Sequence, residues 1–182
     1  KTPLHSMIEQ QKIEAVDVEK QARHFEMVVD LLEKNGMEQY EISNFSRPGF
    51  RSKHNSNYWN GIPYLGLGPS AHSYNKTSRQ WNIANNALYI KAIEENTVPF
   101  EIEVLPLATR YNEYMMTSLR CMEGFQKNYI ESNFGKDFLE HTQTIVNGML
   151  QKEWLTPTPN GYAITKKAKF LADGIASSFF WL

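Results

Sequence analysis

The sequence predicts an α/β segment followed by a mainly helical segment, which together make an α/β-plus-α fold. Two observations predict the first segment: an amphipathic helix over 18–34 and, after a glycine turn, an alternating strand over 37–43. The third observation is a change of pattern after Pro106, where helical periodicity replaces short extended stretches. We therefore expect two domains, one over 1–106 and the other over 107–182.

The composition is that of an ordinary globular protein. Of its 182 residues, 41% are hydrophobic and 21% are charged, and the net charge is -1. No apolar run approaches the roughly 18 residues of a membrane-spanning helix, and the N-terminus lacks the apolar core of a signal peptide. The chain begins with Lys1 rather than Met, so we expect a fragment. The single Cys121 excludes internal disulfides and any cysteine-based cluster held by this chain alone, and it fits a cytoplasmic location.

The first domain should begin with irregular structure, because Pro3 argues against a helix at the very start. Asp17 is a suitable N-cap for the helix over 18–34, and Gly36 suits its C-terminal end. The apolar residues of this helix share spacings of three and four and form one stripe: Ala22, Phe25, Val28, Val29 and Leu32.

A second strand is predicted over 63–68, where glycines would let another backbone or a ligand approach closely. The connection over 44–61 is rich in Asn, Gly and Pro and is predicted as a loop. We expect the strands over 37–43 and 63–68 to pair in parallel through it. The edge of such a sheet would lie open, which favours a homodimer or an apolar flank near 37–42. Three further elements complete the domain: a hairpin over 73–82, a helix over 85–95 and an extended linker over 97–106.

The second domain has a winged-helix pattern. Its elements, in order, are helices over 107–122, 126–134 and 136–153, a hairpin around Asn160-Gly161, and a last helix over 166–177. Winged helices often bind nucleic acid, but 107–182 has eight basic and seven acidic residues, so no excess of positive charge is available for phosphates. We expect a structural or lid role and no nucleic-acid partner.

The stretch over 42–93 contains no acidic residue and is locally basic. Its cations are Arg47, Arg51, Lys53, Lys76, Arg79 and Lys91. Its large aromatic residues include Phe45, Phe50, Tyr58, Trp59, Tyr64, Tyr74 and Trp81. This mixture suits a flat, anionic, partly apolar ligand. The alternative is a basic, loop-rich surface whose aromatic side chains turn inward.

Gly66 to Ala71 matches the dinucleotide-binding pattern G-x-G-x-x-A in letters alone. No amphipathic helix follows it, Pro69 removes one backbone donor, and no carboxylate stands about 20 residues further on. The sequence therefore argues against a Rossmann site.

Two histidines in the basic stretch, His54 and His72, could bind a metal or handle protons, although a lone histidine usually serves as a hydrogen-bonding residue. His54 has unusual neighbours, because Asn55, Tyr58 and Trp59 follow it within five residues. An imidazole can ligate haem iron and aromatic rings can flank the macrocycle. We expect His54 to lie in a flexible loop and, if the ligand is haem, to hold it in preference to His72. Nearby Arg51 and Lys53 could pair with the propionates.

The chain resembles HemW-type proteins, which are radical S-adenosylmethionine (SAM) relatives of oxygen-independent coproporphyrinogen III oxidase. The resemblance rests on four motifs: YEISNFSRPG over 40–49, HNxxYW over 54–59, YLGLGPSAHS over 64–73 and RxxEG over 120–124. It covers essentially the whole chain. It implies that 1–106 holds the last strands and helices of a partial (β/α) radical-SAM barrel and that a winged-helix-like domain follows.

The resemblance also implies cofactors and site residues. His54, Asn55, Tyr58 and Trp59 match the motif associated with haem binding, and Ala71 and His72 fall at one wall of the SAM site. The full-length family carries a C-x-x-x-C-x-x-C loop that holds a [4Fe–4S] cluster. This chain lacks that loop, so it should be catalytically inactive by itself.

Two functions follow from the resemblance. The first is a haem chaperone that binds haem and delivers it to acceptor proteins. The alternative is an oxygen-independent coproporphyrinogen III oxidase, which decarboxylates propionates in porphyrin biosynthesis. The haem motif favours the chaperone. A peripheral membrane contact of the full-length protein is a further hypothesis.

Overall fold

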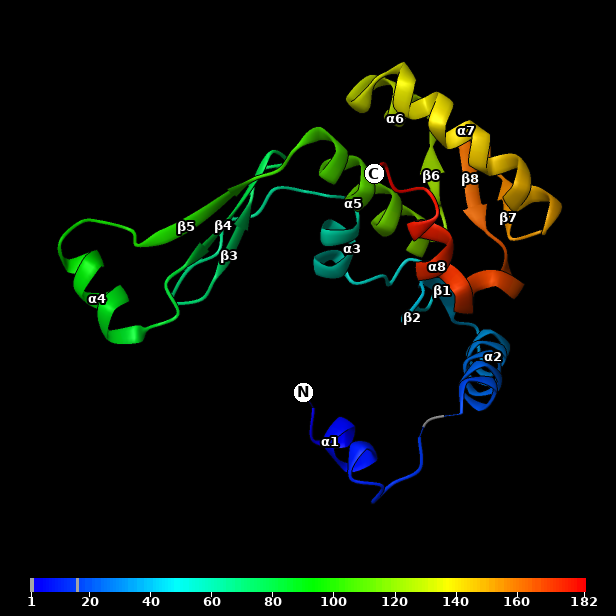
Figure 1. The fold of residues 1–182 in the computed structure, drawn as a ribbon, viewed down its shortest axis with the longest axis horizontal. Helices are drawn as coiled ribbons and strands as arrows, with labels where there is room; N and C mark the ends of the chain where they lie inside the picture. Colours follow the sequence, from blue (N-terminus) through cyan, green and yellow to red (C-terminus); the bar gives the residue numbers. More distant parts are fainter. Residues whose placement is uncertain (1, 16) are drawn as a thin grey trace.

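A computed structural model describes residues 2–15 and 17–182. Figure 1 shows a C-terminal body of helices around a small sheet, an elongated arm that leaves it, and two helices at the N-terminal end. Within the described residues, the strands form one two-stranded and two three-stranded sheets, all antiparallel. The predicted mixture of α and β structure is confirmed.

The chain starts with α1 (Pro3–Glu9), contrary to the expectation of irregular structure. Pro3 occupies the first turn, where its missing N–H would have had no helical partner. The next helix, α2 (Val18–Lys34), has the predicted bounds, and the Asp17 carboxylate caps it by accepting hydrogen bonds from two backbone N–H groups. Gly36 follows it with φ of 76°, a conformation that glycine adopts cheaply.

The predicted parallel pairing is wrong. The strand over 37–43 is shortened to β1 (Glu38–Glu41), which turns back at once and pairs with β2 (Asn44–Ser46) in an antiparallel hairpin. The stretch over 63–68 forms only an isolated antiparallel bridge, between Tyr64 and Tyr74. A tight hairpin closes a much shorter loop than a crossover of about 19 residues, so it costs less chain entropy.

The predicted loop over 44–61 is also wrong, because it contains β2 and a short helix, α3 (Lys53–Trp59). The Ser52 side chain caps this helix by accepting a hydrogen bond from the Asn55 N–H at 3.2 Å. The asparagines of this stretch predicted a loop. A helix forms instead because Ser52 caps it and because Tyr58 and Trp59 contact His54 and Arg120, respectively.

The arm consists of a three-stranded sheet and a helix at its far end (Figure 1). Its elements are β3 (His72–Tyr74), β4 (Ser78–Asn82), α4 (Asn86–Glu94) and β5 (Phe100–Val104). The predicted hairpin and helix are confirmed. The predicted linker over 97–106 is wrong, because it holds β5, which pairs with β4 over five residues.

The C-terminal body contains most of the buried apolar side chains. Its elements are α5 (Leu107–Arg120), β6 (Phe125–Gln126), α6 (Lys127–Phe134), α7 (Lys136–Gln151), β7 (Leu155–Pro157), β8 (Gly161–Ile164), the 3-10 helix η1 (Lys166–Leu171) and α8 (Ala172–Ser177). The three predicted helices and the hairpin follow in the predicted order. The predicted last helix over 166–177 is instead divided into η1 and α8, and β6 was not predicted. Tyr111, Met115, Phe125 and Phe179 lie at the centre of the core.

The hairpin of β1 and β2 is joined to the C-terminal body through the backbone. The Ile42 N–H donates to the Arg120 carbonyl, and the Met122 N–H donates to the Tyr40 carbonyl. The expected apolar flank over 37–42 is therefore wrong, because these residues are buried or half-buried. No helix in the described part of the chain is long and apolar enough to cross a membrane.

Candidate functional site

Helix α3 divides the HNxxYW motif between two of its faces. Residues four apart lie on the same side of a helix, so His54 and Tyr58 share one face and Asn55 and Trp59 share the next. His54 and Tyr58 are exposed, whereas Asn55 and Trp59 are half-buried. The spacing of the motif therefore separates two outward side chains from two that fix the helix to the protein.

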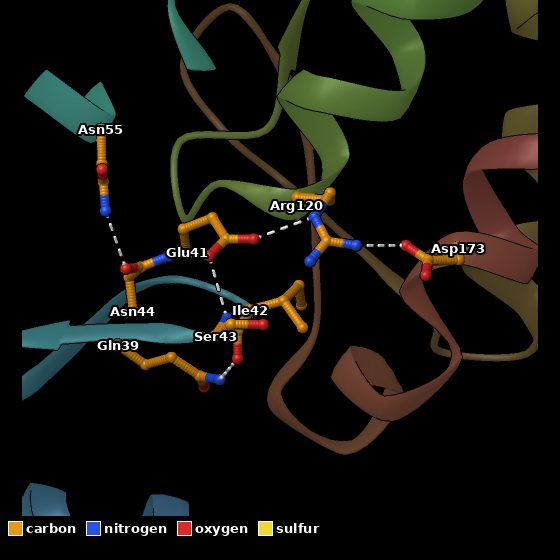
Figure 2. Close-up of polar contacts among 8 residues, drawn as sticks. All are labelled: Gln39, Glu41, Ile42, Ser43, Asn44, Asn55, Arg120 and Asp173. Atoms are coloured by element: carbon orange, nitrogen blue, oxygen red, sulfur yellow. Dashed lines mark hydrogen bonds and ion pairs between the residues drawn. The ribbon is translucent and has the colours of Figure 1, made fainter. Parts of the chain in front are cut away.

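The inward face is held by a polar network that runs into the C-terminal body (Figure 2). The Asn55 side-chain amide donates to the Asn44 Oδ1 at 3.1 Å, and the Asn44 amide donates to the Glu41 carboxylate. Arg120 Nε donates to the other Glu41 oxygen at 2.9 Å, and Arg120 Nη1 donates to Asp173 Oδ1 at 2.6 Å. This chain of contacts, here called the Glu41 network, ties α3 to both α5 and α8.

Trp59 completes the inward face. The guanidinium of Arg120 lies over its ring, with the central carbon 5.5 Å from the ring centroid, a cation–π contact. The Trp59 Nε1 atom is buried and has no hydrogen-bond partner within the described residues. An indole N–H left in this way is a donor available to a ligand.

On the outward face, His54 begins a row of aromatic rings. Its imidazole meets the Tyr58 ring edge-on, with centroids 4.9 Å apart and planes at 87°. Tyr58 meets Tyr64 at 4.9 Å, and Tyr64 lies 6.1 Å from Tyr74 on β3. Burial is the main cause that raises the pKa of Tyr64 and of Tyr74, so both stay neutral at physiological pH.

This row leads into a cleft of about 490 Å³ between α3, the base of the arm and the C-terminal body, here called the α3–α5 cleft. That volume falls within the range of small-molecule sites. Its aromatic lining residues are Tyr58, Trp59, Tyr64, Tyr74, Tyr114, Tyr129 and Phe134. Its charged lining residues are Lys76, Arg79, Arg110, Glu113 and Glu123. His54 does not line the cleft but stands at its rim, in contact with Tyr58.

The structure gives Arg51 a different role from the one predicted. Its Nε donates to Glu38 at 2.9 Å, and its Nη1 donates to Glu123 at 2.6 Å. The hydrogen bond to Glu123 is the main cause that raises its pKa. Arg51 therefore fastens α3 to the C-terminal body and is not free to meet a propionate. Lys53 is exposed on the first turn of α3.

Ala71 and His72, predicted at a SAM wall, lie on the arm toward the end that carries α4, because His72 pairs with Trp81 near the end of β4. Neither residue lines the α3–α5 cleft. The Ala71 carbonyl accepts a hydrogen bond from the Asn82 N–H at 2.9 Å. The exposed His72 faces Trp81 across the hairpin, with ring centroids 6.1 Å apart. Gly66 approaches the backbone of His72 so closely that a side chain there would collide with it. The predicted close approach is thus to another backbone at Gly66, whereas Gly68 has open space around it.

The residues present do not fit an iron–sulfur cluster. Among the described residues no group of three His, Cys, Asp or Glu side chains could hold a metal ion. Cys121 lines the cleft, but burial, followed by the nearby Glu123 and Glu41, raises the pKa of its thiol to about 12. A thiol that stays protonated is a poor metal ligand and a poor nucleophile.

Sequence reasoning missed the partners that make this site. Glu41 falls in the predicted strand and in the YEISNFSRPG motif, but neither indicates that its side chain is fully buried. Arg110 was assigned only to a helix, although it faces the cleft. The RxxEG motif singles out Arg120 in the sequence, but it does not indicate that Arg120 pairs with Glu41, 79 residues earlier.

The fold matches that of a solved radical SAM enzyme. Coproporphyrinogen III oxidase (HemN) from Escherichia coli superposes with a TM-score of 0.64 over 94% of this chain and 44% of that one, at 16% sequence identity. At that identity the likeness shows the fold alone. This chain therefore has the fold of one part of that protein.

The sequence matches are more specific. "Heme chaperone HemW" of Bacillus subtilis (strain 168) is 26% identical over 180 residues, which is 98% of this chain and 48% of that protein. The Lactococcus lactis protein of the same name is 32% identical over 166 residues, 86% of this chain and 44% of that protein. The predicted resemblance to HemW-type proteins is confirmed over most of the chain. The chain spans about half the length of the curated relatives it matches, and no protein-family model matches it.

Proposed function

We propose that this chain is the haem-holding part of a HemW-type haem chaperone, which binds haem and passes it to acceptor proteins. One observation carries the proposal: α3 presents His54 and Tyr58 outward at the rim of an aromatic, basic cleft, in a chain similar to proteins named heme chaperones.

The chemistry of α3 suits transfer of haem better than permanent storage. An exposed imidazole such as His54 can ligate haem iron from one side and still be reached by an acceptor protein. The Tyr58 ring, perpendicular to the imidazole, limits how that imidazole can turn. The Glu41 network and Arg51 hold α3 in place, so an incoming haem would not have to order the helix first.

The SAM and [4Fe–4S] chemistry of the family is separate from the haem binding proposed for this chain. Since the described residues do not fit a cluster, we propose that its cysteines lie outside this chain. Ala71 and His72 remain the proposed SAM wall, with the positions of their backbone fixed by the arm hairpin. No step of haem binding as proposed here depends on either group.

Finer features of the proposal rest on the resemblance and on the element order. We propose that 1–106 completes a (β/α) barrel, that 107–182 acts as a winged-helix-like scaffold, and that the protein is a cytoplasmic homodimer with haem-acceptor partners. The order of α5 to α8 and the placement of the cleft between the two parts support this division.

An absorbance titration of the intact protein with hemin tests the proposal. His54→Ala should weaken binding on the order of tenfold and change the Soret band, whereas His72→Ala should leave both unchanged. Equal binding by the parent and the His54→Ala protein would contradict the assignment. Turnover of coproporphyrinogen III by the intact protein, measured in parallel, would instead support the oxidase.

A further inference from the structure

Two positive charges in the α3–α5 cleft are not neutralised by the protein. Arg79 pairs with Glu113 at 2.5 Å, and Glu123 pairs with Arg51 at 2.6 Å, so both acidic residues of the lining are already engaged. Within the part of the chain that the structure describes, Lys76 and Arg110 form no ion pair. The cleft therefore has room for two negative charges.

The turn that carries Lys76 is fixed rather than loose. The Asn75 side-chain oxygen accepts hydrogen bonds from the backbone N–H groups of Thr77 and Ser78, and Lys76 itself has φ of 79°. The Leu105 N–H donates to the Thr77 carbonyl at 2.9 Å, which holds the turn beside the start of α5. Lys76 is thereby held near the helix that carries Arg110.

Two neutral donors in the same lining also lack partners. Trp59 Nε1 and Ser118 Oγ are buried and unsatisfied in the described structure, and both residues line the cleft. Ser118 is only 8% exposed. Unpartnered polar atoms beside a cavity are uncommon in folded proteins, and a bound ligand is one reason for them. Two cations and two hydrogen-bond donors thus surround a space walled by aromatic rings.

We propose that the α3–α5 cleft recognises the carboxylate edge of a tetrapyrrole, with Lys76 and Arg110 as the residues that select for free carboxylates. The inference rests on the proposed haem function and deepens it. The two carboxylates pair with Lys76 and Arg110, and the rings of Tyr58, Trp59 and Tyr74 contact the macrocycle edge that enters the cleft. His54 stays at the rim, where it meets the metal.

The consequence is that recognition has two separable parts. Carboxylate pairing in the cleft does not need iron, so a metal-free porphyrin with free carboxylates should also bind. Esterification removes the negative charges and should weaken binding while leaving the ring unchanged. Ligation by His54, in contrast, needs the metal and should be insensitive to the esters.

The experiment titrates the intact protein with four ligands: hemin, protoporphyrin IX and the dimethyl ester of each, followed by tryptophan fluorescence and absorbance. The variants are Lys76→Met, Arg110→Met and the double variant. Lys91→Met on α4 is the control, because it removes an exposed cation of the basic stretch that does not line the cleft. Circular dichroism establishes that each variant is folded.

We expect the parent to bind both free acids on the order of tenfold more tightly than their esters. The double variant should lose that preference, and Lys91→Met should keep it. If the parent binds hemin but does not distinguish acids from esters, or if the double variant retains the preference, the inference is overturned and the proposed function stands. If His54→Ala leaves hemin binding unchanged while the acid preference persists, the assignment of His54 as the ligand fails and the inference stands. If the parent binds none of the four ligands, the proposed function fails and the inference fails with it.

Discussion

Arg120 Nε donates a hydrogen bond to Glu41 Oε1 at 2.9 Å, and this contact joins two segments 79 residues apart. The Glu41 side chain is fully buried, and that of Arg120 is 20% exposed. A buried carboxylate is stable only when its charge is compensated and its oxygens accept hydrogen bonds. Ser43 N–H and the Asn44 amide supply the remaining donors, so the hairpin that positions α3 depends on this pair (Figure 2).

Replacing Arg120 should therefore destabilise the protein strongly. Arg120→Gln leaves the Glu41 charge buried without its cation, which typically costs about 3–5 kcal/mol in the free energy of unfolding. Urea denaturation measures the loss. The control is Arg23→Gln, which breaks an exposed pair with Glu19 at 3.8 Å and should change stability by less than about 0.5 kcal/mol. Similar small effects of both substitutions would show that the Glu41 pair is not a structural requirement.

A glycine in the tight turn after α5 should not tolerate alanine. Gly124 has φ of 67°, and a Cβ there would collide with the Tyr162 carbonyl in β8. Gly124→Ala should lower the melting temperature clearly, because the backbone of two segments would have to separate. Gly148→Ala is the matched control: Gly148 lies within α7 with open space around it, so alanine there should stabilise by about 0.5–1 kcal/mol. Opposite signs for the two substitutions are the expected result.

A buried hydroxyl pair in the core should respond asymmetrically to substitution. Thr142 Oγ1 donates to the Phe138 carbonyl at 2.7 Å, so the Tyr111 hydroxyl, 2.9 Å away, must donate to Thr142. Tyr111→Phe removes a donor and leaves Thr142 satisfied, and should cost about 1 kcal/mol. Thr142→Val leaves the Tyr111 hydroxyl buried without an acceptor and should cost up to about 3 kcal/mol. Chemical denaturation of both variants checks the order, which would be reversed if Tyr111 had another acceptor.

Cys121 should be unreactive in the folded protein. Its pKa, raised to about 12 mainly by burial, leaves almost no thiolate at pH 8, so alkylation by iodoacetamide should be far slower than in urea. The folded state holds this proton more tightly than the unfolded state does. The contribution of this thiol to the free energy of unfolding is therefore fully present below about pH 9, and it is lost as the pH rises toward 12. Cys121→Ala should therefore lose less stability than the parent between pH 8 and pH 10, and equal losses would argue against the raised pKa.

The sequence by itself determined the features that depend on neighbours within about four residues. The bounds of α2, the Asp17 cap, the glycine turn after it and the hairpin around Asn160-Gly161 all followed from local spacing and turn chemistry. The four short motifs likewise predicted the resemblance to HemW-type proteins, which the sequence matches confirm.

Only the tertiary structure decided which charged residues pair with distant residues of the chain and which remain free to contact a ligand. Arg51 is as basic as Arg110 in the sequence, but Glu123, 72 residues away, neutralises it, whereas Arg110 faces the cleft. The partner of β1 was decided in the same way, since a short hairpin and backbone contacts to Arg120 displaced the predicted parallel strand. A periodic pattern indicates which face of an element is apolar, but the choice among possible partners depends on long-range packing and loop-closure entropy, which no local pattern contains.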